Sequence, residues 1–202
     1  MNSNAEPDLA PPGAGLPAIE LFIGRLVFTL NRWTTTRQRS NARFEKERDA
    51  IRALLRSCDA ESGGRRVLIE RARGMEDSSR SWSVWMTLDH LRIVNREMAR
   101  VIRDLTQGRM PEGKASTASV KPSPDATATA AAEYEEACDA LLATVAAAAN
   151  LKTTLRHVHP WFGPLNAAGW HALAGGHMGI HRVQIGRILG GLATGAPPAM
   201  HA

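Results

Sequence analysis

The sequence predicts an all-α fold, an antiparallel four-helix bundle with a long connection between its second and third helices. Three observations support this fold class. Apolar residues recur every three or four positions in four long stretches, which is the spacing of one face of an α-helix. No stretch alternates apolar and polar residues over the length of a half-buried strand. Residues 109–130 have only one valine and one methionine as bulky apolar side chains, which indicates a flexible connection.

The length of 202 residues suits one hydrophobic core and is short for two. We expect a flexible N-terminal arm over residues 1–16, one helical domain over residues 17–194 and a tail over residues 195–202. The arm is rich in proline and poor in large apolar residues, so it has little to bury.

The N-terminal region lacks the signals for export and membrane insertion. It is acidic and proline-rich before any apolar run, which is the reverse of a signal peptide. The apolar run 21–30 is too short to span a membrane and is interrupted by Arg25. Cys58 and Cys138 have no CxxC or zinc-finger spacing, so nothing indicates a disulfide framework. We therefore expect a soluble, cytoplasmic protein.

The first helix is expected to begin at Pro17, because proline suits the first turn of a helix. Its apolar residues recur at three and four positions, so we expect this helix to face the core. The stripe consists of Ile19, Phe22, Ile23, Leu26, Val27 and Leu30. A second helical piece, over roughly 41–58, either continues this helix or follows it. A short helix is expected over 65–73, before a loop over 74–81.

Three long helices complete the predicted bundle. The clearest one runs to about residue 107 from Ser81 or Ser83, either of which can cap it. The next is expected over 133–156, with acidic residues in its first turn, where the helix dipole favours them. The last is expected over 166–192, and its first residue, an asparagine, can cap it.

The formal net charge of +5 and the pI of about 9.9 raise the question of nucleic-acid binding. The basic excess lies in residues 1–110, with 19 basic and 14 acidic side chains, whereas residues 111–202 have 6 of each. Both signs are interspersed, as in residues 43–48, and such mixing is typical of a solvated helix face with i,i+4 pairs. A phosphate-binding surface over Arg32–Arg56 is the weaker hypothesis.

Three histidines are candidate metal ligands. His177 and His181 are four residues apart on the last helix, so their Cβ atoms are about 5–6 Å apart on one face and two imidazoles can bind one ion. Both lie on an apolar stripe, and His90 lies midway along the stripe of the second long helix. A buried imidazole needs a hydrogen-bonding partner or a cation. The residues therefore allow three interpretations. The histidines are core residues that other groups satisfy, or they face solvent, or they form a three-histidine metal site with open coordination positions.

Two segments resemble a known family. They are WSVWMTLDHL, residues 82–91, and HPWFGPLNAAGWHALAGGHMGIHRVQIGRIL, residues 159–189. They resemble the DinB-like (YfiT-like) metalloenzymes, in which a histidine follows a Trp-Ser opening of the second long helix and HxxxH precedes Gln-Ile on the last. His90, and then His177 and His181 before Gln184, match this pattern. The resemblance implies a four-helix bundle and makes these histidines the ligands of a divalent metal, Zn, Ni or Fe.

The resemblance also implies a function. Characterised relatives transfer low-molecular-weight thiols or isomerise with the help of a thiol, so we expect a metal-dependent enzyme of the thiol S-transferase type, or a hydrolase. The alternative is a non-catalytic, metal-binding and stress-associated dimeric protein. Expected partners are a small-molecule substrate, of the low-molecular-weight thiol class, and a second copy in a homodimer. We expect neither a membrane nor a nucleic acid as partner, and no catalytic residue is identified.

The remaining histidines and the glycines of the last helix have simpler interpretations. His157 and His159 are expected to serve the C-terminus of the third helix, and His171 to point away from the ligand pair. His201 lies in the tail. A glycine-rich stretch around the ligands either makes room for a substrate or allows close helix packing, and packing is favoured. Its members are Gly175, Gly176 and Gly179.

Overall fold

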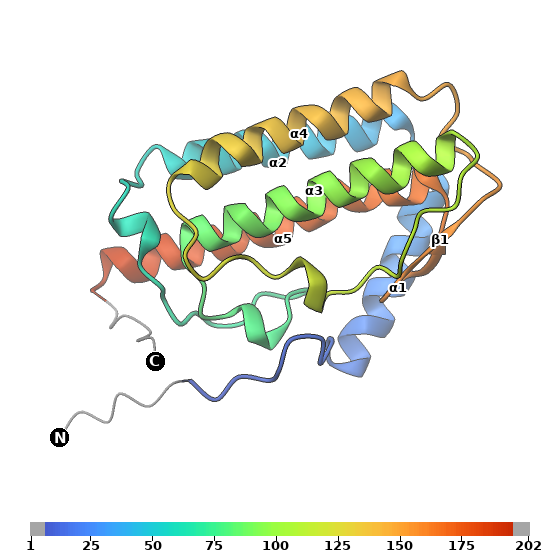
Figure 1. The fold of residues 1–202 in the computed structure, drawn as a ribbon. Coiled ribbons are helices and arrows are strands. Elements are labelled where there is room, and N and C mark those ends of the chain that lie inside the picture. The colour runs from blue at the N-terminus through green and yellow to red at the C-terminus, as the bar shows by residue number, and fades with distance from the viewer. Residues whose placement is uncertain (1–6, 196–202) are drawn as a thin grey trace.

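The computed structural model describes residues 7–195, and within them the chain forms five α-helices and one small sheet. The helices are α1 (Ala18–Thr34), α2 (Arg37–Leu55), α3 (Val84–Thr106), α4 (Thr129–Ala147) and α5 (Ala167–Ala193). Short 3-10 helices lie in the connections at Ser62–Gly64, Asp77–Ser79 and Ala118–Val120. Helices α2 to α5 form the bundle, and α1 lies along its outside (Figure 1). The expected all-α four-helix bundle is confirmed.

The bundle consists of two pairs of helices. The two helices of a pair run in the same direction, and the two pairs run in opposite directions. Arg92 pairs with Glu133 and Arg96 with Glu136, so α3 and α4 run the same way. Helices α2 and α5 also run the same way, opposite to the first pair (Figure 1). The predicted long connection makes this possible, because after α3 the chain runs back along the bundle before α4 begins (Figure 1). The antiparallel arrangement therefore holds between the two pairs.

The core lies between α3, α4 and α5, with α2 closing the remaining side. Helix α3 begins where the Ser83 hydroxyl accepts the Met86 N–H at 3.1 Å, so the second of the two predicted caps is the one used. Its apolar face packs against both α4 and α5. Fully buried side chains at the centre include Leu88, Leu91, Ile102, Tyr134, Leu141 and Ile185.

The expectation that the first helix faces the core is wrong. No residue of α1 is buried, and the predicted apolar stripe is 53–77% exposed. The reason is that α2 to α5 already enclose one another's apolar faces, so that α1 meets the core at its edge, through Phe28. Thr35 and Thr36 are extended, and Thr36 caps α2, so the second helical piece follows the first rather than continuing it.

The short helix expected over 65–73 is also wrong. This segment is extended, and the N–H groups of Val67 and Ile69 donate to the carbonyls of Trp82 and Arg80. Val67 and Ile69 are buried whereas Leu68 between them is exposed, which is the alternation of an extended chain. Three residues are too few for this period to be distinguished from a helical one in the sequence.

The third long helix begins and ends earlier than expected. It spans Thr129–Ala147 rather than 133–156, and after it Leu151 is buried in the core. The Leu151 carbonyl accepts the Ala168 N–H at 2.7 Å, which ties this segment to the start of α5. The chain then forms strand β1 (His157–His159), antiparallel to β2 (Gly163–Leu165), where the sequence indicates no strand. Tertiary contacts here override the helix propensity of the alanine run.

The predicted solvated face with i,i+4 pairs is not what the basic residues of α2 form here, because Arg48 is buried and pairs with another helix. Arg48 forms ion pairs with Glu135 at 2.5 Å and with Asp139 at 2.7 Å, and Arg52 reaches Glu135 at 2.6 Å. These carboxylates belong to α4, so the pairs hold the two helices side by side. Among residues 7–195, no helix combines the length and the apolar character that crossing a bilayer requires.

Candidate metal centre

The three predicted ligands come together where α3 packs against α5. His90 projects from the first half of α3, and His177 and His181 project from successive turns of α5. One ring nitrogen of each lies within 4.8 Å of those of the other two. His90 and His181 are buried and His177 is partly exposed. We call this group the histidine triad; its geometry suits a shared ion, and metal binding itself stays a prediction.

Two of the three imidazoles are oriented by hydrogen bonds on the side away from the triad. His90 Nδ1 lies 2.6 Å from the carbonyl oxygen of Val120, and His181 Nδ1 lies 2.6 Å from Gln184 Oε1. Because both oxygens only accept, both Nδ1 atoms must carry the hydrogen. Gln184 is held in turn by donating to the Ser79 carbonyl at 2.7 Å. The Nε2 atoms of His90 and His181 are thereby left as lone-pair donors, as metal-bound histidines commonly are.

The spacing of the triad nitrogens fits a metal ion. His90 Nε2 and His177 Nε2 are 3.2 Å apart. Two nitrogens bound tetrahedrally to one zinc, at bond lengths of about 2.0–2.1 Å, lie roughly 3.3 Å apart. His177 Nδ1 is buried and has no hydrogen-bond partner among the described residues. The triad therefore has the donor type and the spacing that a zinc-like ion requires.

Burial keeps the triad imidazoles neutral. Loss of solvent lowers the pKa of His90 to about 4, mainly because a charged ring is poorly solvated there. The same cause holds the pKa of His177 and of His181 well below the ordinary value, and the neighbouring histidines lower it further. Only neutral imidazole offers a lone pair to a metal. The triad is accordingly ready to bind a cation at neutral pH.

An aromatic ring and a lysine border the triad. Trp82 stacks on His181, with ring centroids 6.2 Å apart and planes 9° from parallel, and it tilts against His90 at 5.2 Å. Lys121 lies 5.2 Å from the centroid of Trp82 and donates to Glu76 at 3.2 Å. Trp82 itself is buried. The long connection thus supplies a cation and, through the Val120 carbonyl, an outer partner of the triad.

The other histidines lie outside the triad. His171 is buried on α5, and its pKa is lowered to about 4 by burial. The expectation that His157 and His159 serve the C-terminus of the third helix is wrong, because α4 has ended before them and both lie on β1. His159 Nδ1 accepts the N–H groups of the following turn. His201 lies outside the described residues.

The glycines beside the ligands serve helix packing. A Cβ atom on Gly175 would lie 3.0 Å from Arg43 Cγ and 3.2 Å from the Phe44 backbone nitrogen, both on α2. A Cβ atom on Gly179 would lie 3.3 Å from the Glu47 carboxylate. These contacts support the packing interpretation, because α2 approaches α5 too closely for side chains at these positions.

Sequence reasoning missed the groups that orient the triad. The Val120 and Ser79 carbonyls belong to the backbone, and a sequence pattern cannot show them. Gln184 was recoverable, since it lies three residues after His181 and therefore beside it on the same helix face. A glutamine at this spacing from a buried histidine is a usable sign of an oriented imidazole.

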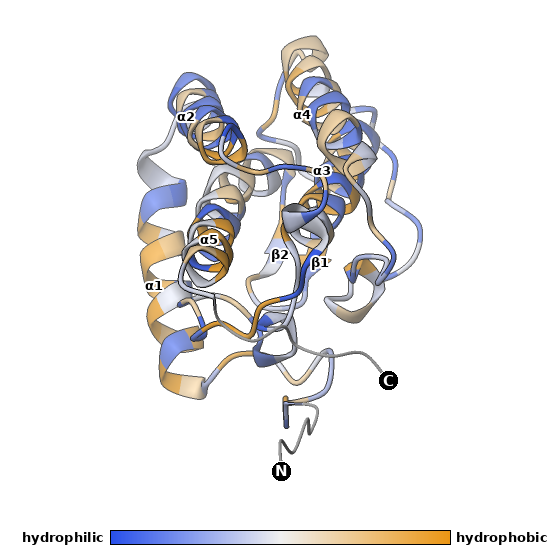
Figure 2. Ribbon diagram, turned by 90° about the vertical axis from the view of Figure 1, so that its left-hand side faces the viewer, coloured by the Kyte–Doolittle hydropathy of each residue, from blue (hydrophilic) through white to orange (hydrophobic). Residues whose placement is uncertain are grey.

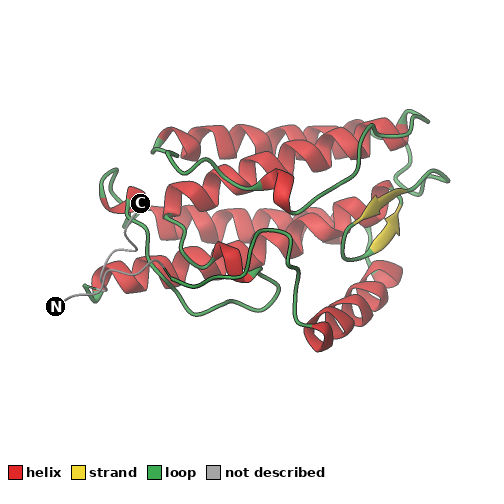
Figure 3. Ribbon diagram, turned by 60° about the horizontal axis from the view of Figure 1, so that its bottom comes forward, coloured by secondary structure: helices red, strands yellow, loops and turns green. Residues whose placement is uncertain are grey.

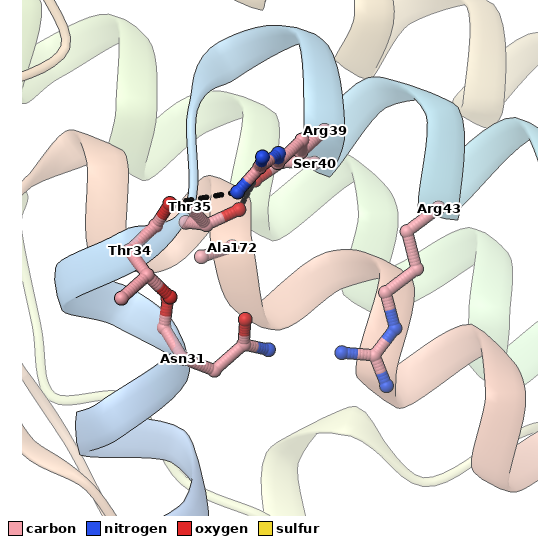
Figure 4. A pocket seen from close by; sticks show the side chains of 7 residues that line it. All are labelled: Asn31, Thr34, Thr35, Arg39, Ser40, Arg43 and Ala172. Atoms are coloured by element: carbon pink, nitrogen blue, oxygen red, sulfur yellow. Dashed lines mark hydrogen bonds between the residues drawn. The ribbon is translucent and has the colours of Figure 1, made fainter.

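Two cavities lie away from the triad. One of about 170 Å³ opens where α1 meets α2, bordered by Asn31, Arg39 and Arg43 (Figure 4). The other, of about 510 Å³, lies between the ends of α3 and α4. None of the triad histidines lines either cavity, so neither is the substrate site of the triad.

Comparison with known proteins agrees with the fold. A solved structure described as TT2238, a four-helix bundle protein, is similar to this chain at 26% sequence identity and a TM-score of 0.53. The match covers 73% of this chain and 96% of that one. No curated protein matches. The DinB superfamily model matches residues 43–185, which include the whole histidine triad and most of the bundle. The chain therefore belongs to the DinB superfamily.

Proposed function

We propose that this protein binds one divalent ion, Zn, Ni or Fe, through His90, His177 and His181. We further propose that it is a metal-dependent enzyme of the thiol S-transferase type. One observation carries the metal proposal: the outer hydrogen bonds of His90 and His181 turn their lone pairs toward a common point. The family resemblance in the sequence supports the choice of reaction.

The residues around the triad favour an anionic ligand. Three neutral imidazoles leave the charge of a bound divalent ion uncompensated, whereas Lys121 beside Trp82 is already paired with Glu76. A divalent ion bound there lowers the pKa of a thiol or water at an open coordination position. Trp82 covers His90 and His181 on one side and keeps water from that face of the rings. These residues suit a ligand that binds as a thiolate.

Metal analysis of the purified protein tests the binding proposal. We expect one equivalent of Zn, Ni or Fe per chain by plasma mass spectrometry and its loss in His177→Ala. His171→Ala is the matched control, because His171 is a buried histidine of the same helix outside the triad. It should keep the metal. Equal metal content in His177→Ala and the parent, with both variants folded by circular dichroism, would reject the site.

A thiol-transfer assay separates the enzyme from the binder. The probe pair is glutathione and 1-chloro-2,4-dinitrobenzene: the sulfur bonds to the ring carbon, chloride leaves and the thiol proton goes to solvent. We expect metal-loaded protein to accelerate this reaction and His177→Ala to fall to the uncatalysed rate. Thiol-independent cleavage of a nitrophenyl ester would instead indicate a hydrolase. Bound metal without either activity would favour the alternative, a non-catalytic metal-binding, stress-associated dimer.

A further inference from the structure

We propose that the exposed face of α1 is a homodimer interface, on which α1 of a second copy packs antiparallel. This assigns a surface and a geometry to the homodimer expected from the sequence. It does not depend on the metal proposal, since α1 contributes no ligand to the triad and lies before the residues that match the DinB model.

The α1 face is unusually apolar for a free surface. Seven large apolar side chains are each more than half exposed, from 53% to 79%. They are Ile19, Phe22, Ile23, Leu26, Val27, Leu30 and Trp33. Figure 2 shows hydrophobic residues along α1 at the left edge of the molecule, beside α5. The two aromatic rings alone present roughly 300 Å², given that such side chains bury 150–250 Å² each. Monomers rarely expose larger contiguous patches than a few hundred Å².

The spacing within this face indicates another helix as its occupant. Ile19, Ile23, Leu26, Leu30 and Trp33 follow each other at intervals of four, three, four and three residues. This is the heptad spacing, with an average period of 3.5, that packs knobs into holes between two helices. Over two heptads an amphipathic helix that lies on lipid has the same spacing, so the charges of α1 decide between lipid and protein. The remaining two members of the face flank the heptad positions.

The heptad positions also favour a second copy in antiparallel orientation. Leu26 is their midpoint, so a two-fold axis there brings Ile19 of one chain opposite Trp33 of the other, and a large residue opposite a smaller one. The same patch then serves both chains, as a two-fold interface requires.

The opposite side of α1 is held by the bundle. Glu20 binds Arg71 and the Gly74 N–H, and its pKa is lowered mainly by the hydrogen bond from Arg71. Arg25 donates to the Trp161 carbonyl at 2.6 Å, and Phe28 packs on Phe162 with ring centroids 4.7 Å apart. Figure 3 shows α1 beside the two-stranded sheet at one end of the bundle. The helix is therefore presented in one orientation, which lowers the entropy cost of docking.

The charges of α1 favour a protein partner over a membrane. A helix that lies on anionic lipid usually has several lysines or arginines on its polar face. Helix α1 has two arginines, and one of them, Arg25, is bound to the Trp161 carbonyl. Glu20 lies on the same polar side. A second copy, which offers an identical apolar stripe, is the partner that this helix fits.

Sedimentation of the full-length protein tests the interface. We expect a dimer for the parent and a monomer for Leu26→Glu, with the apparent Kd raised at least a hundredfold. Met110→Glu is the matched control, since Met110 is 56% exposed and belongs to the connection after α3 rather than to α1. It should remain dimeric. Because Leu26 is 53% exposed, its substitution should leave helix content and metal content unchanged. A monomeric parent, or a dimer that persists in Leu26→Glu, would overturn the proposal.

Cysteine cross-linking tests the antiparallel register. In a Cys58→Ser background, Leu26→Cys should form a disulfide-linked dimer under mild oxidation, because the two positions meet on the axis. Ile19→Cys should not cross-link to itself, since it faces Trp33 of the other chain, and the double variant with Trp33→Cys should. Cross-linking of Ile19→Cys alone would indicate parallel helices and reject the geometry. Binding of the monomer to vesicles of phosphatidylcholine and phosphatidylglycerol, without dimer formation, would reject the protein partner.

Discussion

Helices α1 and α5 show opposite relations between sequence pattern and burial. Helix α1 has the more continuous stripe of large apolar residues, yet none of its residues is buried. Helix α5 carries glycines, alanines and three histidines, and its buried residues include His171, His181 and Gln184. An apolar stripe shows that a face needs covering, and the rest of the fold decides whether the helix's own bundle covers it.

The two helices differ because they meet their neighbours differently. Helix α5 packs against both α2 and α3, and its small residues let α2 approach at van der Waals distance. Its buried Gln184 is tolerated because it has partners in His181 and Ser79. Helix α1 touches the bundle along a narrow side that includes Glu20, Arg25 and Phe28. Burial in this protein thus follows close packing and polar satisfaction rather than hydrophobicity alone.

The first prediction concerns pH and tests whether the interior around α5 is dry. Exposed imidazoles with a pKa of about 6.5 would each be about one-tenth neutral at pH 5.5, so three of them would lose roughly a thousandfold in metal affinity. Burial lowers the pKa of His90 to about 4 and those of His177 and His181 well below the ordinary value. We therefore expect zinc affinity to change less than about tenfold between pH 7 and pH 5.5 and to fall only near pH 4. Competition with a chromophoric chelator measures this, and a thousandfold loss would show that the rings are hydrated.

The apoprotein should lose stability in the same acid range. Its neutral buried histidines bind protons less readily than they do in the unfolded chain, so the unfolded state takes up more protons between about pH 6.5 and pH 4. Stability therefore rises with pH across this window.

The second prediction tests whether the close packing of α2 against α5 requires a glycine at position 175. Gly175→Val would place side-chain atoms against the α2 backbone, where even a Cβ atom lies 3.2 Å from the Phe44 nitrogen. We expect it to lower the free energy of unfolding by about 1–3 kcal/mol in urea denaturation. Gly190→Val is the control, since a Cβ atom at Gly190 meets nothing within 4 Å on the same helix. Equal losses in both variants would mean that helix propensity, and not contact with α2, decides the cost.

The sequence was sufficient for the bundle and the triad because both depend on side-chain spacing. His177 and His181 are four residues apart, so they lie on the same face of α5 wherever the helix begins. The apolar stripe of α3 places His90 on the inward face of that helix. The bounds of α4 and the strand at 157–159 depend instead on tertiary contacts such as the Leu151 carbonyl with the Ala168 N–H. The exposure of α1 could not be predicted from its own sequence, because it depends on how all the helices pack together.

The third prediction concerns Gln184, the polar residue that α5 buries beside a ligand. Gln184→Leu removes the acceptor of the His181 Nδ1–H, so the ring is no longer fixed with its lone pair toward the triad. We expect metal affinity to fall about 10–100-fold, by isothermal titration or chelator competition. Gln184→Glu retains an acceptor and should lose less. Equal metal affinity in Gln184→Leu and the parent would show that Gln184 does not support the site.

The smallest expected effect compares two glycines that have open space around them, one on each helix. A Cβ atom at Gly24 of α1 or at Gly186 of α5 meets nothing within 4 Å, so alanine at either position stabilises its helix by about 1 kcal/mol. Because α5 unfolds with the bundle, Gly186→Ala should raise the global free energy of unfolding by about that amount. Helix α1 has no buried residue, so Gly24→Ala should mainly slow amide exchange within α1 and raise global stability less. The measurement is made in the Leu26→Glu background, so that association does not contribute. An equal global gain from both alanines would show that α1 melts with the bundle, and the contrast between the two helices would then lie only in their exposure.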